Sequence, residues 1–277
     1  MVRVRSSATR PRPGLHHEAE DAGGRRRRWH VLVALARSDL HIRYGRGAGQ
    51  VIQWFVDPFA LVGVYLLLRV ILGRGGEAAG LSLACAVVPF QIVLLSCISS
   101  MSAVSLREPI LLNMRFDRML IPPAAVMTET LAFAASFTMF PITMAVYGIG
   151  PTAALLWLPV IVAVTLVLAV GAAWPAALIG LWLPAIRTLA SQALRIVFFA
   201  APGLVALAEI SDEVRRWIVY NPLTGLFESY RNVFLYGEAP EFAQVFYPLA
   251  VGVVLTLVFL PIYRSERRHF AKLVSDN

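Results

Sequence analysis

The sequence contains little charge, and this scarcity excludes an ordinary water-soluble domain. Only 15% of its 277 residues are charged and 58% are hydrophobic, and the mean hydropathy is +0.67. The apolar residues occur in separate blocks of about twenty or more, each long enough to cross a bilayer. The composition therefore predicts an all-α integral membrane protein, whose crossings are helices.

Several reactive residue types and motifs are scarce or missing. The two cysteines, Cys85 and Cys97, lie in one expected helix roughly 18 Å apart, which is too far for a disulfide. No glycine-rich loop precedes a Lys-Ser or Lys-Thr pair, so we expect no nucleotide hydrolysis through such a loop on this chain. There is no paired His and Cys spacing, nor an Asp-rich cluster suited to hold magnesium against a pyrophosphate. We expect neither a metal nor a cofactor on this chain.

Basic residues are concentrated before the first apolar block. Up to residue 50 the chain has eleven arginines and four acids. The positive-inside rule then places the N-terminus in the cytoplasm, and nucleic acid is disfavoured as a partner. Residues 1–28 lack an apolar period and are expected to form a disordered basic tail. Its run Arg25–Arg28 is interpreted as a topology and lipid anchor, with partner binding as the alternative.

Residues 29–277 are expected to form one transmembrane domain with six crossing helices. The apolar blocks place these spans at residues 51–72, 81–106, 124–147, 153–183, 189–208 and 242–263. The connections that would lie inside carry arginines, whereas the longest outside segment, residues 209–241, has more acids than bases. Both observations favour N- and C-termini in the cytoplasm.

An amphipathic helix is predicted over residues 29–44, directly before the first span. Its apolar side recurs at spacings of three and four residues, and most of its charged residues lie on the other side. The apolar side consists of Trp29, Val33, Ala36, Leu40 and Tyr44. A glycine-rich hinge, residues 45–49, follows, so a helix on the membrane surface turns directly into a crossing one.

The inside connection between the second and third spans, residues 107–123, also has an amphipathic character. It mixes charges with Ile110, Leu111, Phe116 and Leu120, and prolines bound both ends. A solvated loop would not need these apolar side chains. The pattern predicts a short helix that lies on the membrane or docks into a partner, and the partner is favoured.

Several polar and aromatic residues lie within the spans and are candidates for lining a channel. Asp57 and Glu129 are acids in apolar surroundings, where a charge is costly. For Asp57 the alternative is an interfacial ion pair, and for Glu129 a buried polar contact between helices. The aromatic candidates, which pack in the core or at the interfaces if they do not contact sugars, are Trp54, Phe55, Tyr65, Trp174 and Trp182.

The outside segment before the last span is apolar and aromatic but too short to cross comfortably. Residues 218–236 are interrupted by Asn221–Pro222 and by Gly225. This pattern predicts a pair of short helices that dip into the outer leaflet. Arg69, near the outer end of the first span, is expected to snorkel to the headgroups.

The chain carries three motifs whose order along the sequence resembles that in the permease subunits of ABC-type polysaccharide exporters. These exporters move O-antigen, teichoic acid or mycobacterial galactan precursors. The first runs from Asp39 to Tyr44 and continues through the glycine-rich hinge to Trp54 and Asp57-Pro58. The second combines Asn113 with Arg115–Pro122, and the third combines Tyr220–Pro222 with Tyr230-Arg231. Each motif is weak alone, and their order around six spans, from residue 29 to the C-terminus, carries the resemblance.

The resemblance implies a transporter without catalysis of its own, in the cytoplasmic membrane. Two copies would form a homodimer with two copies of a separate ABC ATPase, which would bind ATP and Mg²⁺. The cargo would be a glycan, such as a galactan or an O-antigen-like polymer, on a polyprenyl diphosphate carrier.

The same resemblance implies three sets of site residues. The gate and lipid-diphosphate set is Trp29, Arg37, His41, Arg43, Tyr44 and Arg46. The ATPase-coupling set is Arg107, Glu108, Asn113, Arg115, Phe116, Asp117 and Arg118. The outer re-entrant set is Tyr220, Asn221, Pro222, Tyr230 and Arg231.

Three other functions stay open at this point. A drug or lipid exporter of the same architecture would need a more hydrophobic translocation path. A membrane-embedded enzyme of cell-envelope synthesis is disfavoured by the missing acidic metal cluster. A structural scaffold would be eliminated by ATP-dependent transport that needs this subunit.

Overall fold

The computed structural model describes residues 29–38, 40, 48–73, 76, 78–106 and 118–266 of the chain. A helix over residues 29–38 comes first. The following helices are α2 (Ala48–Ile71), α3 (Ala79–Leu106), α5 (Ile121–Ser136), α6 (Met139–Tyr147), α7 (Leu158–Trp182), α8 (Arg187–Ala200), α9 (Asp212–Ile218), α10 (Pro222–Arg231) and α11 (Phe242–Glu266). Short 3₁₀ turns are Arg118–Leu120, Ala153–Trp157, Pro184–Ile186 and Leu207–Glu209, and a π-helical stretch, Asn232–Tyr236, continues α10. The described ranges contain no β-strand, which confirms the all-α class.

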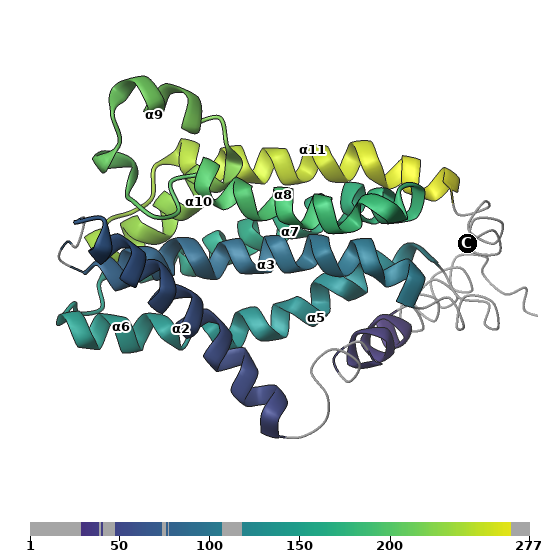
Figure 1. Cartoon of the computed structure of the whole chain (residues 1–277), viewed down its shortest axis with the longest axis horizontal. Coiled ribbons are helices and arrows are strands. Elements are labelled where there is room, and N and C mark those ends of the chain that lie inside the picture. The colour runs from purple at the N-terminus through teal and green to yellow at the C-terminus, as the bar shows by residue number, and fades with distance from the viewer. Residues whose placement is uncertain are drawn as a thin grey trace, which may run out of the picture.

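Five helical segments of the described chain are long and apolar enough to cross a membrane. They are Trp54–Ile71, Ala79–Ala103, Ile121–Tyr147, Ala153–Trp182 and Phe242–Glu266. They agree with five of the six predicted spans. In Figure 1, α3, α7, α8 and α11 run along the long axis of the molecule, and the contacts of α3 with α7 and α8 and of α7 with α11 show that they are neighbours. The chain is therefore a multi-pass membrane protein.

The predicted fifth span, residues 189–208, is wrong as one continuous helix. α8 ends at Ala200 after 14 residues, and a series of turns follows. Pro202 has no N–H to continue the helix and disfavours helical backbone at the residue before it. At 1.5 Å per residue, α8 is about 21 Å long, which is shorter than the hydrocarbon core of a bilayer. The count of six spans stays a prediction.

The third span begins slightly earlier than predicted and consists of two helices. Pro122 and Pro123 occupy the first turn of α5, where the missing N–H of a proline removes no hydrogen bond. A turn at Phe137 and Thr138 separates α5 from α6. The Thr138 hydroxyl donates to the Ala135 carbonyl at 2.8 Å, which satisfies a backbone group at this break.

α3 lies at the centre of the bundle. All its residues from 81 to 90 are buried, and it contacts α2, α5, α7, α8 and α10. On α7, Gly180 lies against the backbone of Met101 on α3, and Gly171 lies against Gly252 of α11. A β-carbon at any of these glycines would collide with backbone atoms. Small residues thus let the three helices pack closely, as is common in membrane proteins.

Short helices lie at both ends of the bundle. α9 and α10 lie at one end, which we call the α10 end, and α11 runs from there to the opposite end, which we call the C-terminal end (Figure 1). The helix over residues 29–38 lies toward this C-terminal end. It contacts α5 there, because the Thr128 hydroxyl donates to the Ala36 carbonyl at 3.3 Å.

Candidate functional site

Four charged residues form a cluster at the α10 end: Arg69, Glu209, Glu228 and Arg231. Two of them come from α10, whose start is well defined. The Asn221 side chain accepts a hydrogen bond from the Leu223 N–H at 3.0 Å, and Pro222 occupies the first helical position. This cap sets the helical register that carries Glu228 and Arg231 inward.

Arg231 is fully buried and joins three parts of the fold. Its Nη1 donates to Oε1 of Glu228 at 2.7 Å. Its Nη2 donates to the carbonyls of Pro202 and Gly203 at 2.8 and 3.3 Å, and its Nε donates to Oγ of Ser82 at 3.2 Å. A buried guanidinium is tolerated when such partners replace its hydration. Arg231 therefore ties α10 to α3 and to the turn that follows α8.

Arg69, near the end of α2, forms the second ion pair. Its Nη2 donates to both carboxylate oxygens of Glu209 at 2.8 and 2.9 Å, and its Nη1 donates to the Leu204 carbonyl at 3.1 Å. The Arg69 side chain is only 6% exposed, whereas that of Glu209 is 41% exposed. The prediction that Arg69 snorkels to the headgroups is wrong, because partners inside the protein satisfy its charge.

The two ion pairs hold the same segment, residues 201–209. Besides its bond to Arg231, Oε1 of Glu228 accepts from the Leu207 N–H at 2.9 Å. Oε1 of Glu209 accepts from the Ala206 N–H at 3.3 Å. The segment is thus held by α2 on one side and by α10 on the other.

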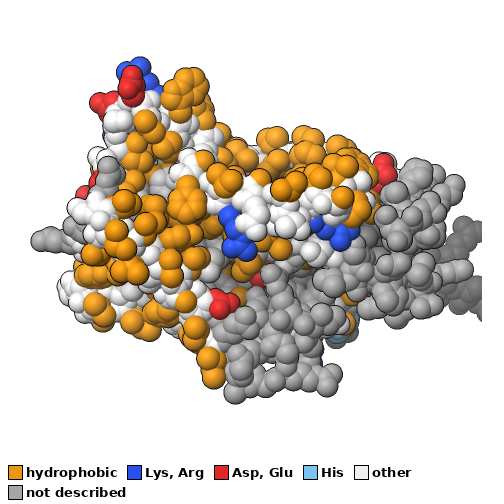
Figure 2. All heavy atoms as spheres, viewed as in Figure 1, with side chains coloured by type: hydrophobic (Ala, Val, Ile, Leu, Met, Phe, Trp, Pro, Cys, Tyr) orange, Lys and Arg blue, Asp and Glu red, His pale blue; other side chains and the backbone are white. Residues whose placement is uncertain are grey.

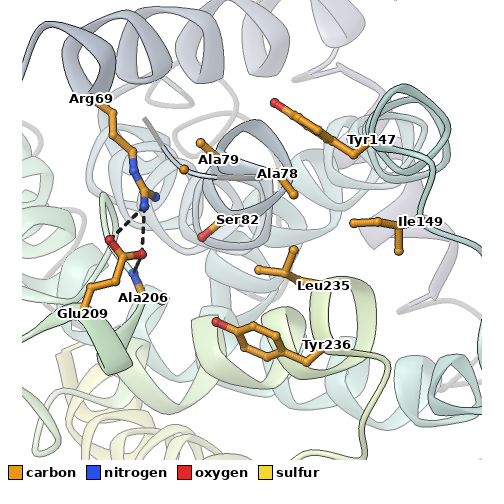
Figure 3. A pocket seen from close by; sticks show the side chains of 11 residues that line it. Arg69, Ala78, Ala79, Ser82, Tyr147, Ile149, Ala206, Glu209, Leu235 and Tyr236 are labelled. Carbon is orange, nitrogen blue, oxygen red and sulfur yellow. Dashed lines mark hydrogen bonds and ion pairs between the residues drawn. The ribbon is translucent and has the colours of Figure 1, made fainter. Parts of the chain in front are cut away.

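A cavity of about 590 Å³ opens beside the Arg69–Glu209 pair. Figure 3 shows this pair on one side of the cavity, Tyr147 and Ile149 on another, and Leu235 and Tyr236 below them. Burial, together with the nearby carboxylate of Glu228, raises the pKa of Tyr236, so its phenol stays neutral at physiological pH. Paired charges and neutral hydroxyls suit a neutral, hydroxylated molecule better than an ion.

The predicted outer re-entrant residues all lie around the α10 end, in different environments. Tyr230 is fully buried, stacks on Phe140 at 5.9 Å, and its hydroxyl lies 3.1 Å from that of Thr165. Tyr220 is 72% exposed, and its carbonyl accepts from the Tyr247 hydroxyl at 2.7 Å. Residues 218–236, where the sequence predicts two short helices, contain α10 and its π-helical continuation, whereas α9 lies before them and ends at Ile218. Re-entry of this segment into the membrane stays a prediction.

Most of the gate and coupling residues lie outside the described part of the chain. In the helix over residues 29–38, Leu35 and Ala36 are buried, whereas Trp29, expected on the apolar side, is 59% exposed, and Arg37 is also exposed. Arg118 begins the 3₁₀ turn before α5. The gate and coupling residues outside the described ranges are His41, Arg43, Tyr44, Arg46, Arg107, Glu108, Asn113, Arg115, Phe116 and Asp117.

The seven channel candidates are not brought together within one chain. Glu129 is buried and accepts from the Ser99 hydroxyl at 2.7 Å, as expected for a polar contact between α3 and α5. Trp174 is buried with its ring 5.3 Å from that of Tyr263, and Tyr65 stacks on Phe198. Trp54 is half-buried, and the exposed candidates are Phe55, Asp57 and Trp182. Their roles in a channel stay predictions.

The sequence interpretation missed both acids of the cluster. Glu228 precedes Arg231 by three positions on one helix, and opposite charges at this spacing indicate an ion pair. Glu209 is 140 positions from Arg69, and no local pattern connects them.

Comparison with known proteins gives relatives but no matching family model. The O-antigen export system permease protein RfbA of Myxococcus xanthus is 27% identical over 248 residues, which is 88% of this chain and 95% of the relative. Two proteins of the same name from Klebsiella pneumoniae are 25% and 24% identical over the same shares.

Proposed function

We propose that this chain, a permease related to those of ABC-type polysaccharide exporters, moves a polyprenyl-diphosphate-linked glycan across the cytoplasmic membrane. The observation that carries the proposal is the similarity to O-antigen export permeases over 88% of the chain, which agrees with the sequence resemblance. Permeases are transport components, so the chemistry of glycan synthesis belongs to other proteins.

Energy for transport comes from a separate partner in this proposal. The chain itself has no phosphate-binding loop, so two copies of it work with two copies of an ABC ATPase that binds ATP and Mg²⁺. The amphipathic connection over residues 107–123 docks into that ATPase. Homodimer formation doubles the set of helices that surround the glycan.

The C-terminal end of the bundle faces the cytoplasm, and the α10 end faces outward. This orientation is supported by the eleven arginines that precede residue 51, and by the helix over residues 29–38, which lies toward the C-terminal end. The carrier diphosphate is then received by Arg43 and Arg46 at the cytoplasmic side. The neutral cavity beside Arg69 and Glu209 lies where the glycan leaves.

Depletion of the protein in its host tests this function. Full-length, carrier-linked polymer should accumulate in the cytoplasmic leaflet, where extraction and quantification of lipid-linked glycans detect it. The wild-type gene supplied in trans is the control and should restore export. If the polymer failed to form, an enzyme of glycan synthesis would be indicated instead, and if glycans were unchanged, a drug or lipid would become the leading cargo.

A further inference from the structure

α8 carries a row of polar residues on a side that faces away from the protein. Thr188, Gln192 and Arg195 recur at spacings of four and three residues, and all three are exposed. Another side of the helix packs inward, because Leu194 and Phe198 belong to the apolar core. The polar row is therefore not needed for packing within this chain.

The contacts of α8 place Arg195 near the middle of the membrane-crossing region. Phe198, one turn after Arg195, lies with its ring 4.9 Å from that of Phe90 on α3. Leu194, directly before Arg195, packs against the cluster formed by Cys97, Met101 and Ala176. Phe90 lies at the centre of the 25-residue span of α3, Ala79–Ala103, and Cys97 lies further toward its end. Arg195 thus lies at the level of the inner part of this span and not at either of its ends.

The charge of Arg195 is not paired within the described chain. No hydrogen bond or ion pair joins its guanidinium to another residue there, unlike Arg69 and Arg231, which each contact a carboxylate. An arginine at the centre of a bilayer costs roughly 2.5–3.5 kcal/mol on insertion scales. Water or an anion is consequently a better neighbour for this side of α8 than lipid.

The adjacent exposed side of α8 is apolar. It consists of Leu189, Ala193, Ile196 and Ala200, which also follow the helical period. Figure 2 shows Arg side chains over α8, with hydrophobic side chains nearby. The helix thus presents two different surfaces outward, and only one of them is suited to lipid.

We propose that Thr188, Gln192 and Arg195 line the water-filled translocation path and that Arg195 binds an anionic group of the passing substrate. The anion is the diphosphate of the carrier or a phosphate or carboxylate on the glycan, and this inference rests on the proposed function. A guanidinium fork matches such oxygens by geometry and by charge. Gln192 and Thr188 lie roughly 5 and 10 Å closer to the C-terminal end, where the substrate enters, so polar contacts precede Arg195 along the path.

Cysteine accessibility tests whether this row faces water, independently of the substrate. The two native cysteines are buried and are first replaced by alanine in the full-length protein. Single cysteines are then placed at Gln192 on the polar row, at Ile196 on the apolar side, and at Leu257 on α11 as a lipid-facing reference. In native membranes, the Gln192→Cys thiol should react with a charged, membrane-impermeant methanethiosulfonate at least about tenfold faster than the other two, because thiolate forms in water and not in lipid. Equal, slow reaction at all three positions would overturn the proposal.

Charge variants of Arg195 test the anion contact. Arg195→Gln should lower export by roughly tenfold to a hundredfold, the loss expected for one charge-assisted hydrogen bond, with an unchanged melting temperature. Arg195→Lys should retain part of the activity, and Ile196→Ala should behave as the wild type. Normal export by Arg195→Gln would overturn the contact. Loss of dimer in this variant would also overturn it, because Arg195 would then pair with an acid of the second copy.

The two proposals fail in distinguishable ways. If the chain exports another cargo, the depletion experiment fails while Gln192→Cys remains accessible to the reagent. If the row faces lipid, export of the glycan still depends on this protein, but Gln192→Cys stays unreactive.

Discussion

Replacement of the buried Arg231 by methionine is expected to destabilise the protein severely. The change keeps an apolar stem of similar length but removes the charge that pairs with Glu228 at 2.7 Å and bonds the Pro202 and Gly203 carbonyls. Glu228, itself only 8% exposed, would keep its carboxylate with the Leu207 N–H as a remaining partner. Breaking a buried pair by removing one partner costs about 3–5 kcal/mol. That cost lowers the folding equilibrium constant roughly 150- to 5,000-fold.

Reversible unfolding of the purified full-length protein in mild detergent measures this effect. Arg216→Met, on the exposed surface of α9, is the matched control and should change stability by less than about 0.5 kcal/mol. The double variant Arg231→Met/Glu228→Leu should be less destabilised than the sum of its single variants, because no unpaired charge remains. The reasoning is refuted if Arg231→Met unfolds like Arg216→Met, or if the two single effects simply add.

Two further predictions concern packing and a buried hydrogen bond. Gly252→Ala should lower the free energy of unfolding by about 1–3 kcal/mol, because the new β-carbon would lie 2.8 Å from the Leu168 α-carbon. Gly63→Ala is the control: its β-carbon would have nothing within 4 Å, so it should be neutral or stabilising in the same melting assay. Equal melting temperatures for the two alanine variants would contradict the close packing of α7 on α11. Tyr230→Phe should cost roughly 1 kcal/mol through loss of the hydroxyl contact with Thr165, and it should cost almost nothing in a Thr165→Val background. An undiminished cost in that background would mean that another partner holds the Tyr230 hydroxyl.

The arginines of this protein illustrate three physical situations. Arg231 is buried and multiply bonded, and Arg69 is buried beside the partly exposed Glu209. Both hold residues 201–209 in place, so they support the α10 end of the bundle. Arg195 is exposed and lacks a partner among the described residues, which is why we assign it to the substrate and not to the fold.

The membrane class and five of the spans follow from the sequence alone. Lipid imposes this outcome, because each crossing needs about twenty consecutive apolar residues whose backbone bonds are satisfied within the same helix. Such a requirement is local, so it is readable from composition in a short window. The end of α8 was locally encoded by Pro202 as well, but average hydropathy does not register a missing backbone donor.

Only the tertiary structure decided which residues of these apolar helices meet. Arg69 pairs with Glu209, 140 positions away, and Gly171 of α7 contacts Gly252 of α11. No periodicity in the sequence indicates either contact. The two outward sides of α8 likewise could be interpreted only from the contacts of α8 with α3, which give the level of Arg195 along the bundle. The reason is physical: a helix that is apolar on most sides can be buried on any of them, so long-range packing, and not local pattern, selects the side that faces the protein.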